Sequence, residues 1–160
     1  MPDEIKNIKT STGQCGAISI PDFREKIIAL QNGMIALIED QKMVPVDCPV
    51  NHHFSGDSYA REIFIPAGTL IIGKIHRHAH VNVISQGECI VYTETGQNIF
   101  KAPLTFVSEP ETKRAVLAVT DVIWTTIHVT SETDLDKIEQ YVISPTYNDL
   151  NVGLIIGGES

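Results

Sequence analysis

Three histidines at every second position, His76, His78 and His80, are the residues of this sequence whose type and spacing are best suited to chemistry. Residues two apart on an extended strand share a face, so the three imidazoles are predicted to point the same way. Neutral imidazole is the commonest metal ligand among side chains, and it titrates near neutral pH. The spacing therefore predicts two or three nitrogen ligands for one metal ion. The alternative is a polar strand end whose histidines only meet solvent.

The segment around these histidines, from Pro66 to Gly87, lies among short apolar runs that are separated by turn residues. Glycine, proline and acidic residues at such separators mark the ends of strands. Residues 44–50 carry two prolines and are predicted to be a linker or an edge strand, whereas 51–58 are predicted to be a turn-rich loop. The predicted strands span residues 59–65, 69–76, 80–86, 88–93, 97–101, 104–107, 114–119 and 122–129. Many short strands at this spacing predict a β-sandwich or a small barrel.

A helix is predicted on each side of these strands. Asp22 and Glu25 resemble a capping box, and apolar residues at near-helical spacing extend the first helix to about residue 39. The pair Asn32-Gly33 interrupts this pattern and marks an alternative, earlier end. Residues 131–134 offer a start for the second helix, whose apolar stripe continues to about residue 142.

Composition limits the classes of function. The chain has 160 residues, 42% hydrophobic and 20% charged, which is enough for one domain with its own core. The formal net charge of −8 argues against nonspecific binding to nucleic acid or to an anionic membrane. Three cysteines without a CxxC pair argue against a disulfide framework and for a reducing compartment. With no signal-like segment and no apolar run of about 18 residues, the protein is predicted to be cytoplasmic.

Several short motifs resemble those of the cupins, which are small jelly-roll barrels. The first cupin motif is similar to Pro66-x-Gly68, His76-x-His78 and Gly87-Glu88 of this chain, and the second to Pro110-Glu-Thr-Lys-Arg114. The resemblance covers roughly residues 45–130. It implies a mainly β, single-domain cupin jelly-roll barrel with one helix before it and one after it, and a pocket inside for a metal or a small molecule.

The resemblance also implies how the chain is divided. An N-terminal arm and packing helix would occupy residues 1–44, the cupin-like barrel 45–130, and a helix and tail 131–160. Cupin-like proteins commonly pair through edge strands, so the resemblance implies a homodimer, and the tail is predicted to be an edge strand or a partner contact. Segments such as Trp124-Thr-Thr-Ile-His128 are also similar to uncharacterised cupin-like proteins of tailed phages and prophages. A phage origin would place the protein in the host cytoplasm.

The sequence departs from the cupin pattern at two ligand positions. His80 stands where the family usually carries a glutamate, and Arg114 stands where the second motif carries a histidine. Arginine remains charged and cannot serve as a metal ligand. What remains is an all-nitrogen cluster of His76, His78 and His80, completed by His128 from a later strand. Such a cluster with water suits zinc, and nickel, iron, copper or manganese are further candidates.

Other polar residues are predicted to contact a small anionic ligand. The guanidinium of Arg114 binds carboxylate or phosphate in a bidentate manner, and Arg61 is a similar but weaker candidate. The alternative for Arg114 is a surface residue paired with a nearby glutamate. Asn82, Trp124 and Tyr59 are predicted to line the pocket, because Asn82 follows His80 on the same face and Trp124 alternates with His128. Lys74 and Arg77 are predicted to be solvated, and His52 and His53 to be loop residues without a role.

Three classes of function follow. The leading one is a pocket that holds a divalent metal and a small anionic ligand. Whether the protein also converts that ligand, as a metal-dependent dioxygenase, isomerase or lyase would, is left open. The second is a metal-free module that binds or sequesters a sugar or nucleotide. The third is a phage accessory or structural protein without catalytic activity. The missing glutamate and histidine weigh against an enzyme, and the three spaced histidines weigh against a purely structural protein.

Overall fold

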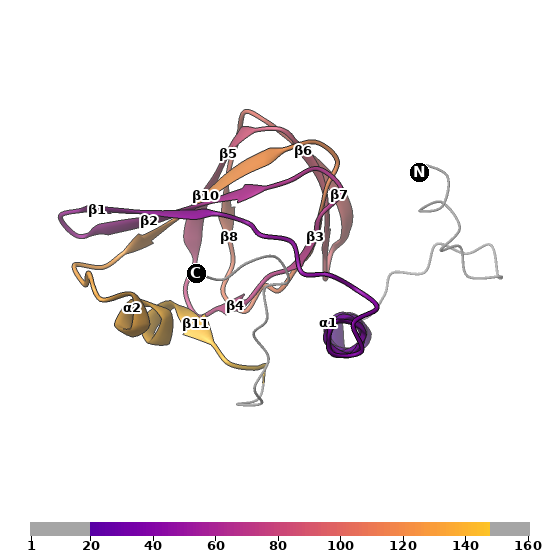
Figure 1. Cartoon of the computed structure of the whole chain (residues 1–160). Coiled ribbons are helices and arrows are strands. Elements are labelled where there is room, and N and C mark those ends of the chain that lie inside the picture. The colour runs from indigo at the N-terminus through magenta and orange to yellow at the C-terminus, as the bar shows by residue number, and fades with distance from the viewer. Residues whose placement is uncertain (1–19, 148–160) are drawn as a thin grey trace.

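The computed structural model describes residues 20–147, which form two antiparallel sheets around a shared core, with helices at the two ends of the chain segment (Figure 1). The first sheet has five strands in the order β1 (Val50–Ser55), β2 (Ser58–Ile65), β10 (Val122–Val129), β5 (His80–Gln86) and β8 (Leu104–Ser108). The second has four in the order β3 (Leu70–Ile72), β9 (Ala115–Ala118), β6 (Glu88–Thr93) and β7 (Gly96–Lys101). A two-stranded sheet pairs β4 (Ile75–His76) with β11 (Ile143–Ser144). The predicted arm and tail lie outside the described residues.

The core lies between the two larger sheets. Side chains alternate across each strand, so Cys89 and Val91 of β6 are fully buried whereas Ile90 between them is only partly buried. Phe106 meets the edge of the Trp124 ring at a centroid distance of 5.6 Å. The buried cluster draws on both sheets and contains Cys48, Ile63, Ile65, Ile71, Ile84, Cys89, Val91, Val116, Ala118, Val122 and Trp124. The prediction of a mainly β protein is thus confirmed.

The first helix, α1 (Ile20–Glu39), packs on the outer side of the four-stranded sheet. Ile27 and Met34 are seven residues apart, share one helix face, and are buried against Ile72 of β3. The helix continues through Gly33, because buried contacts on both sides of it offset the low helix propensity of glycine. The alternative end at Asn32 is therefore wrong.

The second helix, α2 (Leu135–Val142), begins at Asp134, whose carboxylate accepts two backbone N–H hydrogen bonds from the first turn. Its buried residues Ile138 and Val142 pack on Tyr59 of β2. The strand β11 follows directly and pairs with β4, next to the predicted metal ligands (Figure 1). Both predicted helices are confirmed, and the second one lies against the end of the five-stranded sheet.

The predicted strand over 69–76 is interrupted. β3 ends at Ile72, β4 spans only Ile75–His76, and residues 77–79 bend before β5 begins at His80. In the bend, the N–H of Arg77 donates to the carbonyl of Val142 at 2.8 Å. The chain therefore leaves the larger sheet to pair with the segment that follows α2, a partner that the local pattern of apolar residues does not reveal.

The predicted loop over 51–58 is mostly a strand. β1 pairs with β2 along its whole length, in a hairpin whose turn contains Gly56 with a positive φ of 54°. Asn51, His52 and His53 have a composition typical of turns, but a ladder of backbone hydrogen bonds to a long partner outweighs such weak local preferences. As a result, His52 lies on a strand that borders the pocket.

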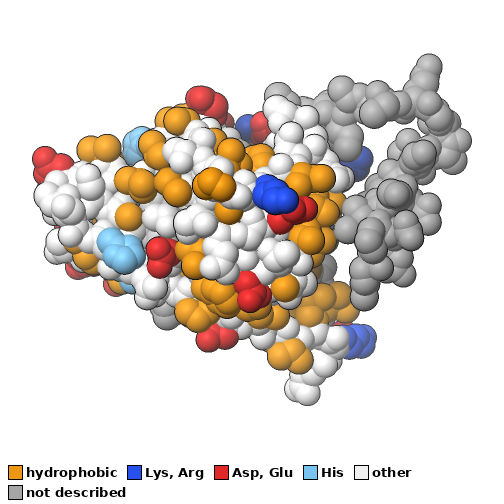
Figure 2. Space-filling view, turned by 90° about the horizontal axis from the view of Figure 1, so that it is seen from above, with side chains coloured by type: hydrophobic (Ala, Val, Ile, Leu, Met, Phe, Trp, Pro, Cys, Tyr) orange, Lys and Arg blue, Asp and Glu red, His pale blue; other side chains and the backbone are white. Residues whose placement is uncertain are grey.

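Within residues 20–147, no helix is long and apolar enough to cross a membrane. On the face shown in Figure 2, charged side chains lie mostly apart from one another, with hydrophobic and uncharged groups between them. The acidic excess of the chain is therefore not gathered into one patch on that face.

The turn between β5 and β6 leaves no room for a side chain at Gly87. Its φ is 89°, and a Cβ at this position would clash with the backbone carbonyl oxygen of Asp121. Gly96 has a comparable φ of 111°, but nothing lies within 4 Å of its Cβ position. Gly87→Ala is therefore expected to lower the free energy of unfolding by at least about 2 kcal/mol more than Gly96→Ala, as measured by urea unfolding. Equal losses in the two variants would contradict the close packing at Gly87.

Candidate metal centre and pocket

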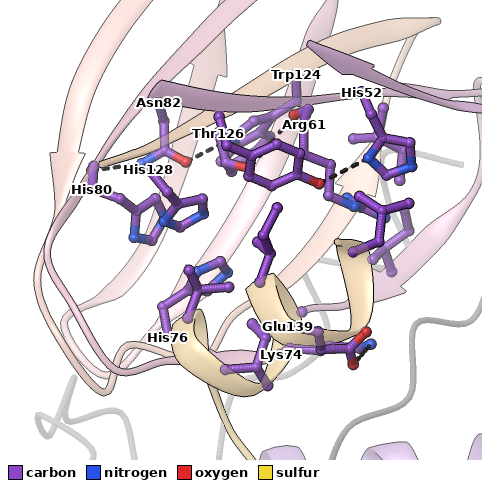
Figure 3. A pocket seen from close by; sticks show the side chains of 18 of the residues that line it. His52, Arg61, Lys74, His76, His80, Asn82, Trp124, Thr126, His128 and Glu139 are labelled. Atoms are coloured by element: carbon purple, nitrogen blue, oxygen red, sulfur yellow. Dashed lines mark hydrogen bonds and ion pairs between the residues drawn. The ribbon is translucent and has the colours of Figure 1, made fainter. Parts of the chain in front are cut away.

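Three imidazoles from three different strands converge at one end of the five-stranded sheet. They belong to His76 of β4, His80 of β5 and His128 of β10, and one ring nitrogen of each lies within 4.8 Å of the others. Their ring centroids are 4.1 Å apart for His76 and His80, 4.8 Å for His80 and His128, and 5.2 Å for His76 and His128. Figure 3 shows the three side chains on one side of the cavity.

His78 lies outside this cluster. Its side chain is exposed, and its ring contacts that of Tyr141 of α2 in a tilted arrangement at a centroid distance of 4.7 Å. The prediction that His76, His78 and His80 share one face is wrong, because residues 77–79 bend and do not continue the strand. The bend turns His76 and His80 towards each other and turns His78 away.

Burial keeps the three clustered imidazoles neutral at neutral pH. It is the largest cause that lowers the pKa of His76 to about 2 and that of His128 to about 4, and it also lowers the pKa of His80. For His76, the charges of His80, His128 and Arg114 act in the same direction; Arg114 also lowers the pKa of His80, and His80 lowers that of His128. Neutral imidazoles have a free lone pair, which is the form that binds metal.

The hydrogen bonds of the cluster leave ligand atoms free. Nδ1 of His80 lies 3.2 Å from the carbonyl oxygen of His78, which requires the proton to be on Nδ1 and leaves Nε2 with a lone pair. Nε2 of His80 and Nδ1 of His76 are buried and have no hydrogen-bond partner within residues 20–147. Buried polar atoms without a partner are uncommon, and these two nitrogens are positioned as metal ligands would be.

The donor set fits a divalent metal. Zinc–nitrogen bonds of about 2.0–2.1 Å place the nitrogens of a tetrahedral site roughly 3.4 Å apart. The three nitrogens, within 4.8 Å of one another, would reach that spacing through small rotations of the imidazoles. Three histidines with an open fourth position are an established zinc arrangement, and imidazole also suits copper, iron and nickel.

A cavity of about 480 Å³ opens beside the histidines. Its floor is apolar and includes Ile63, Ile71 and Val116, which belong to the core between the sheets. Polar side chains of the five-stranded sheet form the wall, and α2 borders the opening through residues such as Ile138. In Figure 3, His52 and Arg61 lie across the cavity from the clustered histidines. A concave site with an apolar floor and few polar groups is typical of a small-molecule pocket.

Arg114 lines this cavity with a guanidinium that has no acidic partner among the described residues. Nη2 donates to the hydroxyl of Ser108 at 2.8 Å, while Nε is buried without a hydrogen-bond partner. The guanidinium lies 5.7 Å from the ring centroid of Phe106 and 5.8 Å from that of Trp124. Burial lowers the pKa of Arg114 to about 10, so the side chain is a buried cation at neutral pH. The alternative of a surface arginine paired with a glutamate is not what the structure shows.

Asn82 and Trp124 line the cavity, but their polar side-chain atoms are hydrogen-bonded to other residues of the protein. Oδ1 of Asn82 accepts from Nε1 of Trp124 at 2.9 Å, and Nδ2 donates to the hydroxyl of Ser108 at 2.7 Å. Because Ser108 also accepts from Arg114, these hydrogen bonds form a chain that ends at the guanidinium. Both side chains thus hold Arg114 in position, and Trp124 offers its ring to the cavity.

Tyr59 is buried at the wall of the cavity. Its hydroxyl lies 2.8 Å from Nδ1 of His52, and its ring stacks near that of His128 at a centroid distance of 6.3 Å. Burial raises the pKa of Tyr59 and lowers that of His52. Arg61 lines the same wall, one position further along that face of β2.

Sequence reasoning missed three residues of the site. Ser108 closes the chain of hydrogen bonds to Arg114, His52 contacts Tyr59, and Lys74 borders the cavity. Lys74 was expected in solvent, but its side chain is only 10% exposed and Nζ lies 2.6 Å from a carboxylate oxygen of Glu139. The signal for His52 is its alternation with Phe54 in a strand that was predicted to be a loop. For Lys74 and Ser108 the sequence holds no comparable signal, because their partners lie in distant elements.

Comparisons with known proteins concern the fold. No protein-family model matches the sequence, and no curated protein matches it. Ectoine synthase from P. lautus superposes with a TM-score of 0.51 at 9% identity, over 64% of this chain and 78% of that one. An RmlC-like cupin from Shewanella frigidimarina gives a TM-score of 0.47 at 18% identity, over 59% of this chain and 90% of that one. A cupin domain from Bordetella pertussis gives 0.43 at 14% identity, over 55% and 98%. At these identities the likeness is one of fold alone.

The clustered histidines are expected to make the stability of the metal-free protein depend on pH. The pKa values in the folded chain, about 2 for His76 and about 4 for His128, lie below the 6.5 of a free histidine. Between these values the unfolded chain binds more protons, so the free energy of unfolding falls as the pH falls below about 6.5, by up to about 1.4 kcal/mol per pH unit for each histidine. His128→Gln should flatten this slope between pH 6.5 and about 4, as measured by urea unfolding in EDTA. An unchanged slope would contradict the neutral state of His128.

The unpaired guanidinium of Arg114 is expected to cost stability. A buried charge without a partner is unfavourable, so Arg114→Met should raise the free energy of unfolding of the ligand-free protein by about 1–3 kcal/mol. Lys101→Met removes the same charge at an exposed position and should change stability by less than about 0.5 kcal/mol. Chemical unfolding measures both variants. A clear loss of stability in Arg114→Met would show that the guanidinium is compensated in the folded protein.

Proposed function

We propose that this protein binds one divalent metal ion through His76, His80 and His128, in the pocket of a cupin-type barrel, together with a small anionic ligand that contacts Arg114. The observation that supports it is the convergence of three neutral imidazoles, two buried and one partly buried, of which two have a buried ring nitrogen without a hydrogen-bond partner among the described residues. A purely structural cluster would be expected to satisfy these nitrogens with hydrogen bonds. His78 is not a ligand in this proposal.

The ligand atoms favour some metals over others. All three are nitrogens, and the described residues bring no carboxylate into the cluster, so zinc, nickel, copper or iron suit it better than manganese, which prefers oxygen. A bound metal would act as a Lewis acid on an oxygen of the small ligand. The residues of the chain would supply the remaining functions, with Arg114 holding the anionic group and Tyr59 and His52 offering a hydroxyl and an imidazole at the wall.

A metal-free binding module is the second candidate. Arg114 supports it, because a buried cation without an acidic partner would attract an anion whether or not a metal is present. In that case the clustered histidines would donate and accept hydrogen bonds to the ligand. Metal content separates the two candidates directly.

Metal binding is expected to depend on His80 and not on His78. Protein purified without a histidine tag would be incubated with zinc, nickel, iron or manganese, separated from free metal and measured by elemental analysis. The wild type should hold about one ion per chain, and His80→Ala should lose at least about tenfold in affinity, because it removes one of three ligands. His78→Ala, two residues away but outside the cluster, should retain the metal. No metal in the wild type with any of the four ions, or equal losses in both variants, would overturn the proposal.

A further inference from the structure

We propose that the ligand of this pocket is an organic carboxylate with an apolar body, whose carboxylate binds Arg114 and whose apolar part lies on the floor of the cavity. The inference rests on the proposed function in that it names the ligand class for the same pocket. It goes beyond a small anion in general, because it excludes sugars, nucleotides and inorganic phosphate as the ligands for which the pocket is built.

The charge in the pocket calls for an anion. Arg114 lines the cavity together with a second cation, Arg61, and no carboxylate of the described residues pairs with Arg114. The acidic residues that line the cavity, Asp136 and Glu139, both come from α2, and Glu139 is paired with Lys74. An incoming anion would therefore find its counter-charge at the guanidinium groups that line the pocket.

The guanidinium is held in one orientation, which favours a planar anion. Ser108 accepts a hydrogen bond from its Nη2 and is itself held by Asn82, which is held by Trp124. Ser108 and Asn82 are both buried, so this chain of hydrogen bonds is shielded from water. A fixed guanidinium matches the two oxygens of a carboxylate in a fork-to-fork pair.

The apolar floor favours a carboxylate with an apolar body over a sugar or a nucleotide as the ligand. Val116 of β9 lies two residues after Arg114 and also lines the cavity. Ile71 of β3 lies opposite Val116 in the sheet. Ile63, Ile65 and the ring of Trp124 complete the floor. Hydroxyl groups placed on this surface would lose their hydrogen bonds to water and gain none. An aliphatic or aromatic group of the ligand would instead bury apolar surface of both the ligand and the floor.

The position of Arg114 also relates the carboxylate to the metal centre. The charge of Arg114 acts on both His76 and His80, and its partner Ser108 pairs with His80 across the β5–β8 ladder. A carboxylate on Arg114 would therefore lie beside the clustered histidines, with the apolar body directed towards the floor. A substituent next to the carboxylate would be the part of the ligand that faces the metal.

The single tryptophan of the chain makes this inference testable without knowledge of the natural ligand. Trp124 is the only tryptophan and lines the cavity close to Arg114, so its fluorescence reports on the pocket. Benzoate and hexanoate are the probes, benzamide is the uncharged control, and inorganic phosphate and glucose 6-phosphate are anions without an apolar body. We expect saturable changes with the two carboxylates and at least about tenfold weaker binding of the other three compounds.

Variants assign the signal to Arg114. Arg114→Met should weaken carboxylate binding by at least about tenfold, whereas Lys101→Met, which removes the same charge outside the pocket, should leave it unchanged. Ser108→Ala keeps the guanidinium but removes the group that orients it, so an intermediate loss is expected. Circular dichroism would verify the fold of each variant, and Ser108→Ala keeps the test decisive if Arg114→Met does not fold.

The titrations are run in EDTA and again after loading with zinc, which separates this inference from the proposed metal site. Carboxylate binding that depends on Arg114 in EDTA supports the inference even if elemental analysis finds no metal. Binding that appears only with zinc and survives Arg114→Met would assign the carboxylate to the metal and overturn it. Preference for phosphate or glucose 6-phosphate would leave an anion site at Arg114 but overturn the carboxylate class. The absence of carboxylate binding in both conditions would overturn it as well.

Discussion

The pairing of the short strands β4 and β11 is the constraint on which the candidate site depends. Ile143 of β11 lies opposite His76, and the N–H of Arg77 donates to the carbonyl of Val142. On the other side, the carbonyl of His76 accepts from the N–H of Glu111 at 2.8 Å. These bonds hold the His76 backbone between the segment after α2 and the segment before Arg114. They turn His76 towards His80, and they keep α2 at the opening of the cavity.

Desolvation governs the chemistry of the site. Burial lowers the pKa values of the clustered histidines and also that of Arg114, a cation with no acidic partner in the part of the chain that the structure describes. Lys113, the neighbour of Arg114, is fully buried as well and donates to the carbonyl of Gly73 at 2.8 Å. Such groups lower the stability of the folded chain, and functional sites commonly tolerate this cost because binding of a ligand offsets it.

The two departures from the cupin motifs that the sequence resembles fit together electrostatically in the proposed site. A histidine in place of the usual glutamate removes a negative charge, and an arginine in place of the usual histidine adds a positive one. A divalent metal on three neutral imidazoles would keep its full double charge, with Arg114 nearby. An anionic ligand would then supply the negative charge that the protein does not. The proposed carboxylate follows from this balance as well as from the shape of the cavity.

Much of the fold and part of the site are determined by the sequence alone. Alternating apolar residues and turn residues between them predict strands such as β5, β6 and β10, because a half-buried strand has a period of two. Helical spacing and a helix start over residues 131–134 likewise predict α2, which the structure caps at Asp134. The residue types of His76, His80, His128 and Arg114 indicate nitrogen ligands and an anion contact, since these properties belong to the side chains themselves.

Only the tertiary structure decides which of these side chains meet. His78 has the same local spacing as its neighbours, yet it points away, because a bend held by the distant Val142 and Ile143 replaces a continuous strand. His128 joins the cluster from β10, far along the chain. Ser108, at the end of β8, orients Arg114 through a hydrogen bond. Periodicity describes one strand at a time, whereas the direction of a side chain in a pocket depends on pairings between segments that are distant in the sequence.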